Sequence, residues 1–114
     1  KIRNILITSG LLTNLYYFSD IRNKYDILDL VFLNKINLTN LKKILFNYKK
    51  ILIADENYSS SSIIDLIYPA LMYLERENIK IIVPTNNQDL FYASRNSILQ
   101  KYKLTPKSIL KVNV

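Results

Sequence analysis

Four short runs of β-branched and other apolar residues recur along the chain, and each is followed by a segment with helical spacing. The runs cover residues 4–9, 25–33, 50–55 and 80–83. Strands that alternate with helices in this way build a mostly parallel sheet with helices packed on both faces. The alternation continues to the end of the chain, without an internal repeat or a linker. The sequence therefore predicts a single α/β domain over residues 1–114.

Capping residues mark where several of the helices begin. Asn37 or Thr39 can cap the second helix, and Thr105 followed by Pro106 begins a short last helix. Pro69 should kink the long third helix or delay its start, because proline lacks the backbone N–H and clashes with the preceding turn. The expected helices cover residues 11–23, 38–49, 59–74, 94–102 and 106–110, and a terminal strand is expected at 111–114.

The chain contains no cysteine and no histidine. Disulfides, zinc–thiolate sites and a Ser-His-Asp triad are therefore excluded. The aspartates are scattered without the spacing of a metal site. No run of about 18 apolar residues is present, so no membrane span is expected. The sequence starts without methionine, and we expect it to be a piece of a longer chain.

The net charge of +7 suggests either a nucleic-acid partner or a bias in composition. Asn, Ile, Lys and Tyr together make up 51 of the 114 residues, and A/T-rich codons encode all four. Only four of the 16 basic residues are arginine, which binds phosphates and bases in a bidentate manner better than lysine does. The composition therefore favours coding bias, and nucleic acid is not the expected partner.

Two adjacent acids, Asp55 and Glu56, follow the third strand, at the edge where open α/β sheets bind ligands. Adjacent strand residues point to opposite faces, so an acid–base pair acting on one substrate is not expected. Glu56 is instead expected to accept hydrogen bonds from backbone N–H groups at a helix start, or to pair with a base at a subunit contact. The serines at 59–62 are expected to cap a helix, although a helix start can also bind an anion.

Five stretches of the chain resemble the C-terminal domain of the transketolase family. They are residues 5–10 (ILITSG), 29–37 (DLVFLNKIN), 51–58 (ILIADENY), 83–93 (VPTNNQDLFYA) and 101–109 (KYKLTPKSI). The family includes transketolase, deoxyxylulose phosphate synthase and the beta subunit of the first component of the 2-oxo acid dehydrogenases. The chain differs from the family in having serines where glycines usually follow the acid pair.

The resemblance implies a three-layer α/β/α sandwich with a mostly parallel, five-stranded sheet. It also implies an assembly domain that contributes no catalytic, cofactor-binding or metal-binding residue, because other domains of the parent enzyme hold thiamine diphosphate and Mg²⁺. The implied partners are other subunits in a dimer or heterotetramer, and an acyltransferase component; the implied location is the cytoplasm or an organellar matrix. The interface candidates are Asp55, Glu56, Asn57, Tyr58, Phe91 and Tyr92.

A second interpretation is that the chain is a stand-alone basic module for an acidic protein or a nucleic acid. Its candidate surface is a cluster of four lysines, Lys42, Lys43, Lys49 and Lys50. A solvated helix face is the alternative for these lysines.

Overall fold

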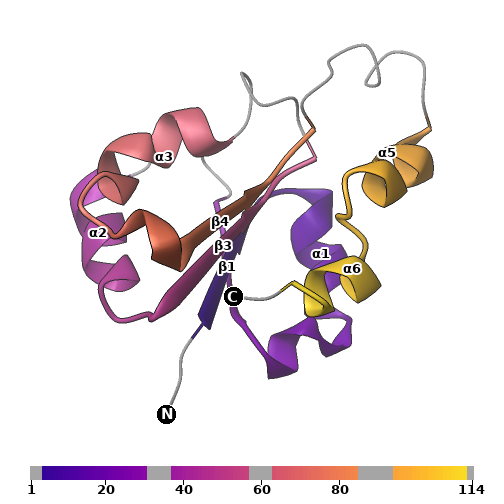
Figure 1. The fold of residues 1–114 in the computed structure, drawn as a ribbon, viewed down its shortest axis with the longest axis horizontal. Coiled ribbons are helices and arrows are strands. Elements are labelled where there is room, and N and C mark those ends of the chain that lie inside the picture. Colours follow the sequence, from indigo (N-terminus) through magenta and orange to yellow (C-terminus); the bar gives the residue numbers. More distant parts are fainter. Residues whose placement is uncertain (1–3, 31–36, 57–62, 85–93, 113–114) are drawn as a thin grey trace.

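The computed structural model describes residues 4–30, 37–56, 63–84 and 94–112, which form an α/β sandwich with three layers (Figure 1). The described strands are β1 (Asn4–Thr8), β2 (Asp26–Asp29), β3 (Lys50–Ala54) and β4 (Ile79–Ile82). They pair in parallel in the order β2-β1-β3-β4. The predicted fold class, an α/β sandwich with a parallel sheet, is confirmed.

Alternate residues of the two central strands serve two separate cores. On one face, odd-numbered residues of β1 and β3 pack against α2 (Leu38–Leu45) and α3 (Ile63–Leu71). On the other face, even-numbered residues pack against α1 (Leu11–Tyr17), α5 (Arg95–Lys101) and α6 (Pro106–Leu110). Both faces of these strands are therefore apolar, which explains why the sequence runs are almost continuously hydrophobic.

Side-chain caps fix most of the helix starts that the sequence predicts. Asn37 accepts a hydrogen bond from the N–H of Asn40, so Asn37 rather than Thr39 is the cap of α2. Ser94 and Thr105 cap α5 and α6 in the same way. Gly10, with φ of 64°, makes the tight turn from β1 into α1.

The helix expected over residues 11–23 is wrong as a continuous element. The structure has α1, then a break, then the 3₁₀ turn η1 (Asp20–Asn23). The Ser19 hydroxyl donates to the carbonyl of Tyr16 and accepts from the N–H of Ile21. These local bonds satisfy backbone groups that a continuous helix would pair, so they end one helix and start the next turn.

The fifth strand is not found among the described residues. Lys111 lies in a turn after α6 and Val112 has no strand partner, while 113–114 lie outside the described ranges. Pro69 lies inside α3, and residues 59–62, which were expected to open this helix, lie outside the described ranges. A second 3₁₀ turn, η4 (Arg76–Asn78), leads into β4.

Candidate functional site

The carboxyl edge of the sheet between β1 and β3 is where a ligand would be expected in this topology. From β1 the chain crosses to β2 on one side, and it then returns to β3 on the other side. The helices that follow β1 and β3 therefore cover opposite faces, which is the arrangement at which open α/β sheets bind ligands. The predicted acid pair, Asp55 and Glu56, lies at this edge, directly after β3.

Asp55 is a buried carboxylate that holds the start of α3. Only 1% of the residue is exposed. Its Oδ2 accepts a hydrogen bond of 2.8 Å from the N–H of Ile63, the first residue of the helix. A carboxylate at a helix N-terminus also interacts favourably with the helix dipole. Asp55 thus joins β3 to α3.

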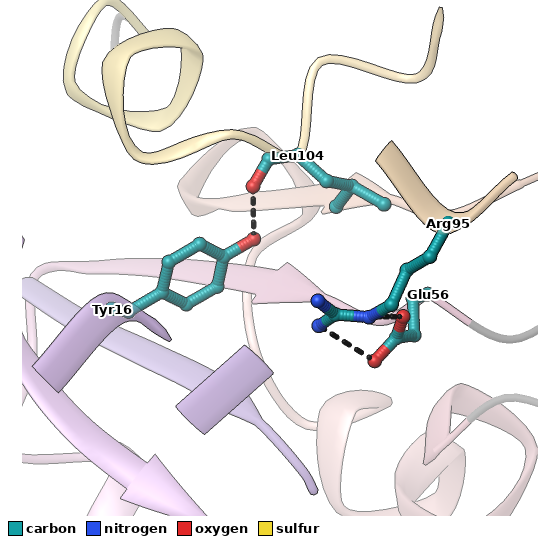
Figure 2. A network of polar contacts seen from close by, with 4 residues as sticks. All are labelled: Tyr16, Glu56, Arg95 and Leu104. Carbon is teal, nitrogen blue, oxygen red and sulfur yellow. Dashed lines mark hydrogen bonds and ion pairs between the residues drawn. The ribbon is translucent and has the colours of Figure 1, made fainter. Parts of the chain in front are cut away.

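Glu56 has a different partner and binds Arg95 at the start of α5 (Figure 2). Nε of Arg95 donates to Oε2 at 2.8 Å and Nη2 donates to Oε1 at 3.3 Å, so the pair is bidentate. The side chains of Arg95 and Glu56 are 40% and 23% exposed, respectively. A pair this exposed contributes at most about 1 kcal/mol, so its main effect is to orient α5.

These contacts change the expectation for the two acids. The hydrogen bond to a helix start was expected for Glu56, but Asp55 makes it. Glu56 does pair with a base, and that base is Arg95 of the same chain. The two carboxylates thus bind different partners, the N–H of Ile63 and the guanidinium of Arg95.

Tyr16 provides a second connection, within the helical layer that α1, α5 and α6 form on one face of the sheet (Figure 2). Its side chain is fully buried, and its hydroxyl donates a 2.6 Å hydrogen bond to the carbonyl oxygen of Leu104, between α5 and α6. Burial raises the pKa of Tyr16 far above its usual value, and the negative charge of Glu56 adds to the effect while Arg95 opposes it. At neutral pH, Tyr16 is therefore a neutral donor that ties α1 to the C-terminal helices.

We expect Tyr16→Phe to lower the free energy of unfolding by about 1–2 kcal/mol, because the buried carbonyl of Leu104 loses its donor. Urea denaturation followed by circular dichroism measures the change. Tyr17→Phe is the matched control, since Tyr17 is 52% exposed and should change stability by less than about 0.5 kcal/mol. Equal effects of the two substitutions would contradict a structural role for the Tyr16 hydroxyl.

Tyr25 gives the protein a defined response to alkali. Burial raises the pKa of Tyr25 from 10.0 to about 12. The folded state thus keeps a proton that the unfolded chain releases above pH 10, so the stabilisation is complete below pH 10 and is lost as the pH rises towards 12. We expect Tyr25→Phe to flatten the fall in Tm over this range. The measurement is Tm from pH 8 to 11.5, and an unchanged slope would contradict the assignment.

The other sequence candidates are only partly described. Asn57, Tyr58, Phe91, Tyr92 and the serines at 59–62 lie outside the described residues. Two of the four lysines make contacts within the chain. Nζ of Lys42 lies 3.4 Å from the centre of the Tyr73 ring, and Nζ of Lys50 donates to Asn78 at 3.2 Å.

Among the residues that the structure describes, no three potential metal ligands lie close together. The described carboxylates therefore do not form a metal centre. In the same ranges, no helix is long and apolar enough to cross a membrane. No sequence pattern pointed to Arg95, which lies 39 residues from Glu56 along the chain. Tyr16 follows Leu12 at helical spacing, so a buried position could have been inferred, although the acceptor could not.

Comparison with known proteins supports the fold. No family model matches the chain, and no curated protein matches it either. Among solved structures, the chain is similar to one described as a split gene transketolase, an inactive beta4 tetramer, with a TM-score of 0.69 and 13% sequence identity. The similarity covers 95% of this chain, which spans 37% of the length of that transketolase chain. The residues that the structure describes thus have a transketolase-like α/β fold.

Proposed function

We propose that this chain is an assembly domain of a transketolase-like, thiamine-diphosphate-dependent enzyme that acts on ketose phosphates or 2-oxo acids. The observation that carries the proposal is the similarity of fold over 95% of the chain. The matched chain is described as a beta4 tetramer, which supports subunit contact as the role of such a fold. The parent enzyme would be a dimer or heterotetramer, with an acyltransferase component as a further partner in the dehydrogenase branch.

The polar groups at the carboxyl edge support a role in assembly rather than in catalysis. The Asp55 carboxylate holds the start of α3, and Glu56 holds Arg95 of α5. Magnesium with a diphosphate requires carboxylate or amide oxygens that are open to the ion. Asp55 and Glu56 do not fit that group, because both carboxylates already bind donors of the same chain. Thiamine diphosphate and Mg²⁺ would therefore be held by other domains.

The test is to measure thiamine diphosphate binding by isothermal titration calorimetry, with Mg²⁺ present, for this chain alone and after mixing with its cofactor-binding domains or subunit. We expect no binding by the chain alone, and a stoichiometric complex with the cofactor-binding partner by size-exclusion chromatography with light scattering. Turnover or cofactor binding by the chain alone would contradict the proposal.

The same preparation distinguishes the alternative of a basic interaction module. We expect weak binding to a random-sequence DNA duplex at 0.15 M salt. The excess positive charge comes mainly from lysines, and coding bias accounts for their number. Tight binding whose logarithm falls steeply with the logarithm of salt concentration would favour the nucleic-acid module instead.

A further inference from the structure

An apolar groove of about 490 Å³ lies between α3 and the edge strand β4. It is lined by Tyr68, Leu71, Met72, Leu74, Ile79 and Ile81. Large parts of three lining residues face solvent: Met72 is 67% exposed, Tyr68 is 49% exposed and Ile81 is 46% exposed. Among the described residues, no strand lies beside β4 on its outer side.

The apolar surface continues beyond the groove. Tyr73, which follows Met72, is 66% exposed, and Lys42 connects its ring to that of Phe46, with Nζ 3.4 Å from one ring centre and 5.9 Å from the other. Five side chains of this size and exposure present on the order of 600 Å² of surface. This is as large as the largest apolar patch on a typical monomer, and it approaches the roughly 800 Å² that each partner buries in a standard interface.

The free edge of β4 offers backbone groups as well. The carbonyl oxygen of Ile82 accepts a hydrogen bond from the N–H of Asp55, so the backbone of Ile82 faces β3. Along a strand, the backbone groups of successive residues point to opposite edges. The N–H and C=O groups of Ile79 and Ile81 therefore face outward. An edge of this kind is a template for another strand.

We propose that the occupant of this surface is a second copy of the chain, paired antiparallel through β4 about a two-fold axis. The inference rests on the proposed function, because it identifies the surface that makes the subunit contact. A two-fold contact is self-complementary, so one edge and one apolar patch suffice to form it. The two sheets would join into one continuous sheet, and the two α3 helices would meet over the joint.

Charge and backbone direction together select the register. If Ile81 faces Ile81 of the second copy, the outward N–H and C=O groups form a hydrogen-bonded pair, and Lys80 faces Ile82. A shift that centred the dyad on Lys80 would bring two like charges directly opposite each other, which is unfavourable. The dyad therefore passes beside Ile81, whose side chain points into the groove.

The absence of cysteine from the chain permits a clean cross-linking test. In a hydrogen-bonded antiparallel pair the Cα atoms are about 5.5 Å apart, which is within the range for a disulfide. We expect Ile81→Cys to form a covalent dimer under mild oxidation, as seen on a non-reducing gel. Lys80→Cys and Phe18→Cys are the controls, and both should stay largely uncross-linked; Phe18 is 81% exposed and follows α1 on the other layer.

The second variant is Ile81→Lys, which places two charges at the dyad but leaves each fold intact because Ile81 is half exposed. We expect the dimer Kd, from analytical ultracentrifugation, to rise at least about 30-fold, with an unchanged Tm in dilute samples. Phe18→Lys should leave the Kd unchanged. A monomeric protein at about 100 μM would overturn the inference, as would a dimer that Ile81→Lys leaves intact; neither result alters the cofactor and co-assembly test above.

Discussion

Replacing Leu52 with alanine should lower the free energy of unfolding by about 3–4 kcal/mol. Leu52 lies in the middle of the central strand β3 and is fully buried against α1 and the C-terminal helices. The substitution removes the apolar contacts that the Leu52 side chain makes with these helices. It also leaves a cavity that the rigid sheet fills only partly. Urea denaturation measures the loss. The slope of the free energy of unfolding against urea concentration is compared with that of the parent protein.

The matched control for this substitution is Leu11→Ala. Leu11 is 62% exposed at the first position of α1, so deletion of the same atoms should cost less than about 1 kcal/mol. A domain of this size is stable by about 5–15 kcal/mol, so the Leu52 variant should still fold. Similar losses for the two variants would show that Leu52 is not in the core.

Replacing Asp55 with alanine should cost about 2–3 kcal/mol, because a hydrogen bond to a charged acceptor is lost and the N–H of Ile63 is left without it. Asp55→Asn keeps an acceptor oxygen of the same size but removes the charge that favours the helix start. We expect the asparagine variant to lose about half as much stability. Hydrogen exchange of the α3 amides should quicken in the alanine variant more than exchange of the β1 amides.

Two results would contradict this account of Asp55. If alanine and asparagine cost the same, the retained acceptor contributes nothing. If exchange quickens equally throughout the chain, Asp55 supports the whole fold rather than the start of α3. Glu56→Gln is a convenient comparison, since its exposed pair with Arg95 should contribute no more than about 1 kcal/mol.

The sheet could be predicted from the sequence because its signal is local. Residues 5–7 and 51–54 are apolar on both faces, and only a central strand between two helical layers needs that pattern. The caps at Asn37, Ser94 and Thr105 are local signals too. Ser19 was missed, because helical spacing of apolar residues continues across it while its hydroxyl redirects the backbone.

The contacts of the candidate site could not be predicted, because they join distant parts of the chain. Glu56 and Arg95 are 39 residues apart, and Tyr16 and Leu104 are 88 apart. Strand alternation predicts that Asp55 and Glu56 point to opposite faces, but only the local path of the backbone decides that Asp55 reaches α3 while Glu56 reaches α5. The edge of the sheet was predictable, but the partners at that edge were not.

The strand order has a consequence for how the chain acquires its shape. Because β1 lies between β2 and β3, the middle of the sheet is complete once residue 54 is in place. During synthesis, a nascent chain of that length can already nucleate on its own central strands. Folding should therefore start in the first half, and the last helices would dock late, when the Tyr16 hydroxyl meets Leu104.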